Sequence, residues 1–159
     1  MMLMENLRIC EGIKPATAAG AKSGDWVSLK GFERLLILVH IAQGNAATTA
    51  ITVDKATLVD GTGNSDGITM NNWWKLVDTP QTADTWVKGT AAASITSSAT
   101  GTGSSLYAIE IAASELGAYD CVQVELGASN AANVVSAAYL LSNARFAEKA
   151  ANWLSAMVD

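Results

Sequence analysis

The sequence predicts an all-β protein: an antiparallel β-sandwich of a jelly-roll-like kind, with an extended N-terminal arm and a short C-terminal helix. Two observations lead to this prediction. Between Trp26 and Leu141, short apolar runs recur every roughly ten residues and are separated by turns rich in Gly, Asn and Ser. No long helical pattern alternates with these runs, which argues against a fold built from β-α-β units.

The expected strands share β-branched, aromatic and aliphatic residues bounded by turn formers. In order they are Trp26–Leu29, Arg34–Gln43, Thr48–Val53, Ile68–Val77, Thr85–Lys88, Ala93–Ser97, Leu106–Ile111, Cys121–Leu126 and Val134–Leu141. The run at Arg34–Gln43 is apolar at successive positions, which is typical of a strand covered on both faces. Thr48–Val53 alternates instead, and we expect it to pair with that strand across the turn Gly44–Ala47.

The connections follow from turn chemistry. Asp60–Gly67 reads as a long tip loop because Asp, Gly and Asn tolerate positive φ. Ser114–Tyr119 reads as a corner with a helical turn. In the closing strands, alternation is expected to place Tyr107, Ile109 and Ile111 on one face, and Val122, Val124 and Leu126 on one face.

The chain divides into an arm (residues 1–24), a sandwich domain (25–142) and an amphipathic tail helix (143–159), started by Ser142 or Asn143. One stripe of the tail helix carries its apolar residues: Phe146, Ala150, Trp153, Leu154 and Met157. The arm lies either on its own domain or on a neighbour, and the tail packs either on its own sandwich or on another subunit. Partner contacts are expected at Leu3, Leu7, Ile9 and Ile13 in the arm, and at Trp153, Leu154 and Met157 in the tail.

Composition excludes several functions. Only 16% of residues are charged and the net charge is −5, with the few basic residues scattered, which argues against nucleic acid as a partner. The longest uninterrupted apolar run, Leu35–Val39, is far shorter than a membrane span. The N-terminus has no pattern of a signal peptide, so a cytosolic product is expected. A mean hydropathy of +0.22 suggests that other chains cover part of the apolar surface.

Residues suited to chemistry are few, and no catalytic, cofactor-binding or metal-binding residue is assigned. The single histidine, His40, is expected to be a core or interface residue with one nitrogen hydrogen-bonded. Cys10 and Cys121 are expected to be isolated thiols, although a bridge between them stays open. The loop at Asp60 lacks the glycine and glutamate spacing of a calcium loop, which leaves a hairpin tip or a loosely bound surface cation.

Two further functions have candidate residues in the sequence. The acidic pairs Asp54 with Asp60 and Glu110 with Glu125 have the residue types of a glycosidase, but solvated outer-face residues explain them, the second pair on neighbouring strands. A carbohydrate would stack on tryptophans, of which three are candidates: Trp73, Trp74 and Trp86. Adjacent strand residues face opposite sides, so at least one of the first two belongs to the core.

Four stretches resemble small virion proteins of tailed bacteriophages. The final strand, VVSAAYLLSNARF (Val134–Phe146), resembles their Tyr-Leu-Leu, then Ala-Arg-aromatic ending. The other three are GDWVSLKGFERLLILVHIAQG, TAITVDKATLVDGTGN and YAIEIAASELGAYDCVQVELGAS. The resemblance covers roughly residues 24–146 and contains no catalytic signature. The first 20 or so residues and the tail after Phe146 depart from the shorter members.

The resemblance implies a capsid decoration, or cement, protein. Such a protein is a non-enzymatic β-sandwich that is made in the host cytoplasm and binds the outside of the shell. Its implied partners are the major capsid protein and further copies of itself, as a dimer or trimer. Two alternatives remain open: a tail, neck or baseplate component, and a carbohydrate-binding or receptor-binding module.

Overall fold

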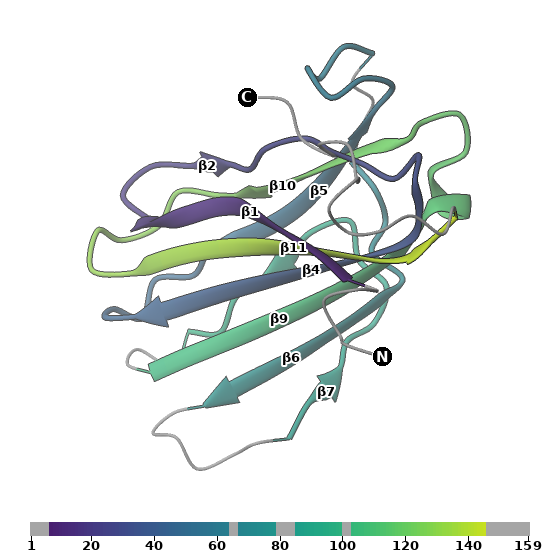
Figure 1. Ribbon diagram of the computed structural model, residues 1–159. Helices are drawn as coiled ribbons and strands as arrows, with labels where there is room; N and C mark the ends of the chain where they lie inside the picture. The colour runs from purple at the N-terminus through teal and green to yellow at the C-terminus, as the bar shows by residue number, and fades with distance from the viewer. Residues whose placement is uncertain (1–6, 64–66, 79–84, 100–102, 146–159) are drawn as a thin grey trace.

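Two antiparallel sheets stack face to face in the computed structural model (Figure 1), which describes residues 7–63, 67–78, 85–99 and 103–145. The elements, in order, are β1 (Leu7–Thr17), β2 (Lys22–Ser23), β3 (Val27–Ser28), β4 (Phe32–Gln43), β5 (Ala50–Ala56), β6 (Asn72–Asp78), β7 (Val87–Lys88), β8 (Ile95–Thr96), β9 (Gly103–Ala112), the 3₁₀ turn η2 (Ala113–Leu116), β10 (Cys121–Leu126) and β11 (Val134–Ala144).

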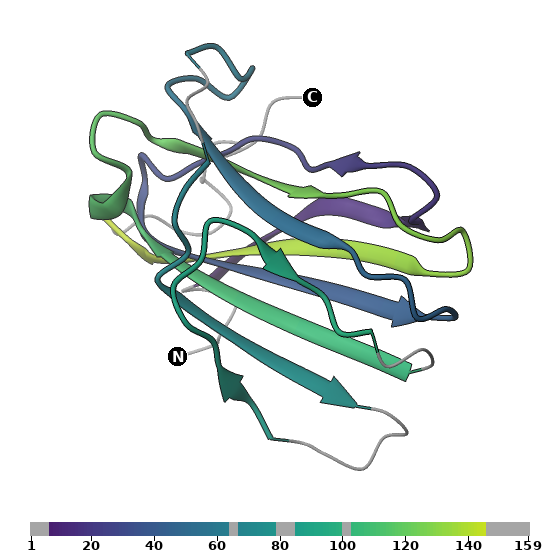
Figure 2. The same cartoon turned by 180° about the vertical axis from the view of Figure 1, so that it is seen from behind.

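One sheet has six strands in the order β1-β11-β4-β9-β6-β7. The other has the order β2-β10-β5-β8, with β3 also paired to β10, and lies behind the first (Figures 1 and 2). These two sheets confirm the predicted all-β sandwich. The jelly-roll-like connection of the strands stays a prediction.

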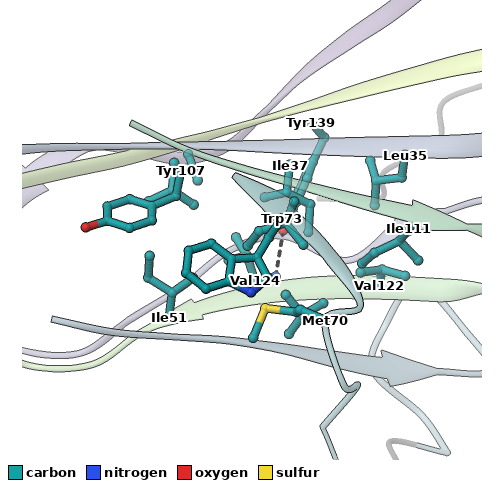
Figure 3. Packing of buried hydrophobic residues seen from close by; sticks show 14 of the residues in the cluster. Leu35, Ile37, Ile51, Met70, Trp73, Tyr107, Ile111, Val122, Val124 and Tyr139 are labelled. Carbon is teal, nitrogen blue, oxygen red and sulfur yellow. Dashed lines mark hydrogen bonds between the residues drawn. The ribbon is translucent and has the colours of Figure 1, made fainter. Parts of the chain in front are cut away.

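The core lies between the sheets because each inner strand buries alternate residues. In β4, Leu35, Ile37 and Val39 are fully buried, and in the opposite sheet Val53 and Val124 are fully buried as well. Figure 3 shows side chains of both sheets meeting in this layer, with Trp73 and Met70 filling its lower part. The predicted inward faces of the strands that contain Tyr107 and Val122 are therefore confirmed.

The predicted pairing of Thr48–Val53 with the preceding strand is wrong. Strand β5 pairs with β10 and β8 in the five-stranded sheet, whereas β4 pairs with β11 and β9 in the other sheet. Because β4 has a neighbour on each side, it has no free edge for β5. Residues 44–47 consequently form a crossing between the sheets and not a hairpin turn.

Most of the predicted arm that the structure describes belongs to the sandwich. Residues Leu7–Thr17 form β1, an edge strand paired with β11. Two irregularities in register, between Glu11 and Ile13 and between Ile13 and Ala16, interrupt the strand. A β-bulge of this kind inserts an extra residue and breaks the alternation of apolar and polar positions, so the sequence shows no period there.

The sandwich extends further toward the C-terminus than residue 142, where the sequence predicted its end. Ser142 and Asn143 were expected to cap a helix, but β11 continues through them to Ala144, which pairs with Phe32. Asn143 has a φ of 55°, a left-handed conformation that asparagine tolerates. The remaining tail, residues 146–159, lies outside the described residues, so its helix stays a prediction.

A tyrosine hydroxyl completes the sheet where β2 and β3 leave a gap. Both short strands pair with β10, but the residues between them do not continue the ladder. There the Val124 N–H donates to the Oη of Tyr139 at 3.0 Å, and the Gly24 N–H donates to the Val124 carbonyl at 2.8 Å. Burial raises the pKa of the Tyr139 hydroxyl, so it stays protonated.

We therefore expect Tyr139→Phe to lower the free energy of unfolding by about 1–2 kcal/mol, because the buried Val124 N–H loses its acceptor. Urea unfolding followed by circular dichroism measures the change. Tyr119→Phe is the matched control, since that ring is partly exposed. If both variants lose the same free energy of unfolding, the hydrogen bond from the Val124 N–H to the Tyr139 hydroxyl does not stabilise the sheet.

Two buried hydroxyls have no hydrogen-bond partner among the described residues: Thr49 Oγ1 and Ser105 Oγ. Burying an unpaired hydroxyl costs free energy, so Thr49→Val should raise the free energy of unfolding by about 1 kcal/mol. The control is Ser97→Ala, which removes the Oγ that accepts the Thr49 N–H at 2.7 Å and should be destabilising. Thermal unfolding should therefore show a higher midpoint for Thr49→Val and a lower midpoint for Ser97→Ala. A lower midpoint for Thr49→Val would refute the prediction for that variant.

Candidate functional site

The outward side of the six-stranded sheet is apolar. Cross-strand pairing places Leu36 beside Leu140, and Leu38 beside Ala138 and Ala108. We call this surface the apolar outer face and define it by nine residues: Ile9, Leu36, Leu38, Trp74, Leu76, Leu106, Ala108, Ala138 and Leu140. Each is at least partly exposed, and Ile9 is 51% exposed. A contiguous apolar surface of this kind marks an interaction site.

The opposite side of the molecule has different chemistry. The outward residues of the five-stranded sheet form a polar outer face: Ser23, Thr52, Asp54, Gln123 and Glu125. Ser23 donates a hydrogen bond to Glu125 at 3.2 Å, and Gln123 donates through Nε2 to the Gly24 carbonyl. One sheet therefore has a polar outer face, whereas the outer face of the other combines an apolar patch with polar residues such as Glu11, Arg34 and His40.

Polar groups mark two ends of the apolar outer face. At one end Arg34 pairs with Glu110, and a shallow pocket of about 270 Å³ lies beside this pair. A second pocket of about 280 Å³ lies beyond η2 and includes the ion pair of Lys30 with Asp120. Both volumes fall below the about 300–1,000 Å³ of typical small-molecule sites.

His40 lies at the other end of the face and is exposed, so the prediction of a core position is wrong and an interface position remains. Its Nε2 is 2.6 Å from the Oγ of Ser104, which fits the expected single hydrogen bond. Ser104 sits in β9 between two paired strands, β4 and β6. Backbone N–H groups in such a position serve the ladder, so they are not free to stabilise an oxyanion.

The candidate acid pair Glu110 and Glu125 is not assembled. Glu110 lies in the six-stranded sheet beside Arg34, and Glu125 lies on the polar outer face of the other sheet. The chain crosses between the sheets at η2, so strands that are consecutive in sequence point their polar sides in opposite directions. The two carboxylates therefore cannot act on one glycosidic bond.

The other acidic candidates also have local roles. Asp60 accepts the Thr62 N–H at 2.8 Å, which lowers the pKa of its carboxyl group and keeps it ionised. The predicted tip loop has positive φ at Gly61 and Gly63, as expected, while residues 64–66 lie outside the described part. No group of three or more His, Cys, Asp or Glu residues suited to a metal occurs within the described ranges.

The tryptophans divide as the alternation requires. Trp73 is 9% exposed and belongs to the core, whereas Trp74 is on the apolar outer face. The ammonium group of Lys88 lies 5.5 Å from the centre of the Trp74 ring, and Trp86 is 42% exposed. Trp74 and Trp86 thus remain candidates for stacking, although Lys88 already occupies one side of Trp74.

Both cysteines are free thiols: Cys10 is in the six-stranded sheet and Cys121 is buried in the other. Burial raises the pKa of the Cys121 thiol to about 12, which makes it unreactive near neutral pH. Across the part of the chain that the structure describes, no helix is long and apolar enough to cross a bilayer.

The predicted contact residues of the arm have different environments. Ile9 is exposed and Leu7 is partly exposed, but Ile13 is 6% exposed and packs in the core, so it is not accessible to a partner. Leu3, Trp153, Leu154 and Met157 lie outside the described residues. Leu36 and Leu38 were not predicted as contact residues, although the continuous apolar run that contains them predicted a strand covered on both faces.

Comparison with known proteins gives a likeness in structure but not in sequence. No family model matches the chain, and no curated protein sequence matches it. Among solved structures, it is similar to the SPBc2 prophage-derived protein YomS, with 8% identity and a TM-score of 0.50, over 87% of this chain and 94% of that one. The two proteins share a fold.

Two virus structures are much weaker matches. The structures of the Gx and Gt strains of infectious bursal disease virus have TM-scores of 0.28 and 0.26 and 13% identity, each over 86% of this chain and 41% of that chain. At such scores they carry no argument about this protein.

Proposed function

We propose that this chain is a structural protein of a phage virion, without enzymatic activity, and that it acts as a capsid cement protein on the outside of the shell. The observation that carries the proposal is the apolar outer face on a domain whose opposite side is polar. A cement protein makes many small contacts with the shell and with further copies of itself, and an extended apolar sheet face is suited to contacts between subunits.

The chemistry of the described residues supports a role in assembly. His40 and Ser104 lie on the paired strands β4 and β9, the carboxylates of Glu110 and Glu125 face opposite sides, and the Cys121 thiol is buried. Glu110 borders a shallow pocket of about 270 Å³, which is below the about 300–1,000 Å³ of typical small-molecule sites. Surface complementarity is the property that this part of the chain offers.

Fold likeness supports the same class of protein. YomS, which shares the fold over nearly its whole length, is described as prophage-derived. The sequence resemblance to small phage virion proteins covers roughly residues 24–146, which includes every strand of the sandwich except β1 and β2. Both favour a phage protein, and the sequence resemblance favours one that belongs to the particle.

The test uses particles of a phage that encodes this chain, with its gene intact or deleted. We expect the protein to remain with purified intact particles in amounts comparable to the major capsid protein. Added to gene-deleted particles, the purified full chain should bind the shells until saturation and raise the temperature at which they release DNA. Absence from both shell and tail fractions would refute a virion role.

Fractionation separates the main alternative. If the chain copurifies with detached tails at low copy number, it is a tail, neck or baseplate component and not a cement protein. Mass spectrometry of separated heads and tails measures this directly.

The carbohydrate-binding alternative rests on the exposure of Trp86 and its neighbour Trp74. A glycan array with the wild-type chain and the Trp86→Ala variant tests it. Binding that the variant loses would favour this second function, whereas no binding in either protein would remove it.

A further inference from the structure

We propose that the apolar outer face binds the C-terminal segment, residues 146–159, of a second copy of this chain, so that two copies exchange their tails. The proposal rests on the proposed function in one respect, namely that the chain works as part of an assembly. The proposal goes beyond that function by naming what binds the apolar outer face, which is residues 146–159 of a second copy.

The apolar outer face needs a cover that the described chain does not provide. Strand β4 has leucines on both sides: Leu35 is fully buried between the sheets, whereas Leu36 and Leu38 point outward and stay partly exposed. The continuous apolar run predicted a strand covered on both faces. Among the described residues only the inner face is covered, by the five-stranded sheet.

The tail has the composition and length of a fitting cover. Its helical pattern gathers Phe146, Trp153 and Met157 on one side and places Glu148, Asn152 and Asp159 on the other. A helix of these 14 residues would be about 21 Å long and about 10 Å wide. The apolar outer face from β1 to β6 spans four strand intervals, or about 19 Å, so the apolar stripe matches it in length.

The point where the tail leaves the sandwich favours a second copy over the same chain. Strand β11 runs to Ala144, and the Arg145 N–H donates to the Gly31 carbonyl at 2.9 Å. The chain is thus held at the end of the sheet up to the residue before Phe146, where the apolar stripe begins. A strand that turns back into a helix on its own sheet needs a connection of about 2–6 residues. In the sequence the stripe starts directly after Arg145, which leaves no such connection, and a short connection favours exchange between copies.

The size of the face argues for exchanged tails over two faces packed flat together. Three rows of outward residues, at Leu36, Leu38 and His40, extend about 14 Å along the strands, so the face covers about 270 Å². A stable interface buries about 800 Å² on each partner. Two tails, each lying on the other copy, add two helix-on-sheet contacts and bring the buried area toward that value.

The pocket beside Arg34 and Glu110 could hold one side chain of the tail on this surface. It is lined by apolar atoms of Leu7, Leu36 and Leu140, with Ser142 at its edge. A volume of about 270 Å³ suits one large apolar side chain of the stripe. It lies at the same end of the sheet as the last residues of β11, because Ser142 pairs with both Arg34 and Leu7.

Cross-linking between two distinguishable full chains tests the exchange. One chain carries Leu38→Cys and the other carries Trp153→Cys and a mass tag, both in a Cys10→Ser background, and the two are co-expressed and mildly oxidised. We expect a disulfide-linked heterodimer to exceed both homodimers on a non-reducing gel. As the matched control, Thr52→Cys on the polar outer face should not link to Trp153→Cys.

Three outcomes overturn the proposal. A link within one chain that carries both Leu38→Cys and Trp153→Cys, without links between chains, means that the tail covers its own face. Predominant Leu38→Cys homodimers mean that two faces pack directly. Absence of any link shows that the tail does not reach the apolar outer face.

Light scattering gives a second test without cysteines. We expect the full chain to be a dimer and the chain that ends at Arg145 to be a monomer with the circular dichroism of an intact sandwich. A truncated chain that stays dimeric would overturn the proposal. If the full chain is a monomer and still decorates shells, the exchange of tails is refuted and the proposed function is kept. If the chain forms an exchanged dimer but is absent from virions, the proposed function is refuted and the exchange is kept.

Discussion

Asn133→Ala should lower the free energy of unfolding by about 3 kcal/mol, because one fully buried side chain holds two loops together. Its Oδ1 accepts the N–H groups of Gly44 at 3.0 Å and Asn45 at 2.9 Å. Its Nδ2 donates to the Ala47 carbonyl at 2.9 Å and to Ser129 Oγ at 3.2 Å. Alanine removes all four bonds and leaves a cavity where the amide group was.

Thermal unfolding measures this loss as a midpoint lower by about 6–12 °C, since 1 kcal/mol corresponds to about 2–4 °C for a chain of this size. The control is Asn130→Ala in the same loop. Asn130 is exposed, and its Oδ1 accepts one N–H, that of Ala132, so its loss should stay below about 1 kcal/mol. If both variants unfold at the same temperature, Asn133 does not hold the crossing between β4 and β5.

Gly89→Ala should also lower the free energy of unfolding by about 3 kcal/mol, because a Cβ at this position would overlap with the Cε2 and Cζ2 atoms of Trp73. The indole cannot move away easily. It is 9% exposed, and its Nε1 donates to the Thr90 carbonyl at 2.7 Å. The Gly89 N–H also donates to the Trp73 carbonyl at 2.9 Å, which fixes the backbone against the ring.

Urea unfolding with near-ultraviolet circular dichroism reports both the stability and the displaced indole. Gly31→Ala is the control, because nothing lies within 4 Å of a Cβ built there. We expect that control to be nearly neutral. An unchanged spectrum and midpoint in Gly89→Ala would show that the packing of the Trp73 indole does not require a glycine at position 89.

Local patterns were sufficient to predict most strands. Runs of β-branched and aliphatic residues located β4, β9, β10 and β11 within a few residues, because a strand that packs on a core must present an apolar side. The division of Trp73 and Trp74 between core and surface followed from the same alternation. These features depend on neighbours along the chain, which the sequence contains.

Pairings between distant segments were not predictable in this way. Strand β5 was assigned to the wrong sheet because the buried amide of Asn133, 89 residues after Gly44, helps to set the path of the crossing. Strand β1 was read as an arm because its bulges remove the period that identifies a strand. The acid pair Glu110 and Glu125 failed for a similar reason, since η2 moves the chain from one sheet to the other.

The candidate site was predicted only in part. The sequence predicted that the strand with Leu36 and Leu38 would be covered on both faces, but not that this chain's own sandwich covers only one of them. The arm and the tail were expected to carry the partner contacts, whereas the structure adds an outward sheet face of the sandwich. Which surface of a sandwich stays apolar depends on the order of its strands, and local pattern does not determine that order.

An electron cryomicroscopy map of the native particle tests the central claim most directly. The account predicts density of this sandwich in regular array on the outer surface of the shell, with the apolar outer face turned away from solvent. Density confined to the tail or baseplate, or particles in which every copy of the apolar outer face is open to solvent, would contradict it.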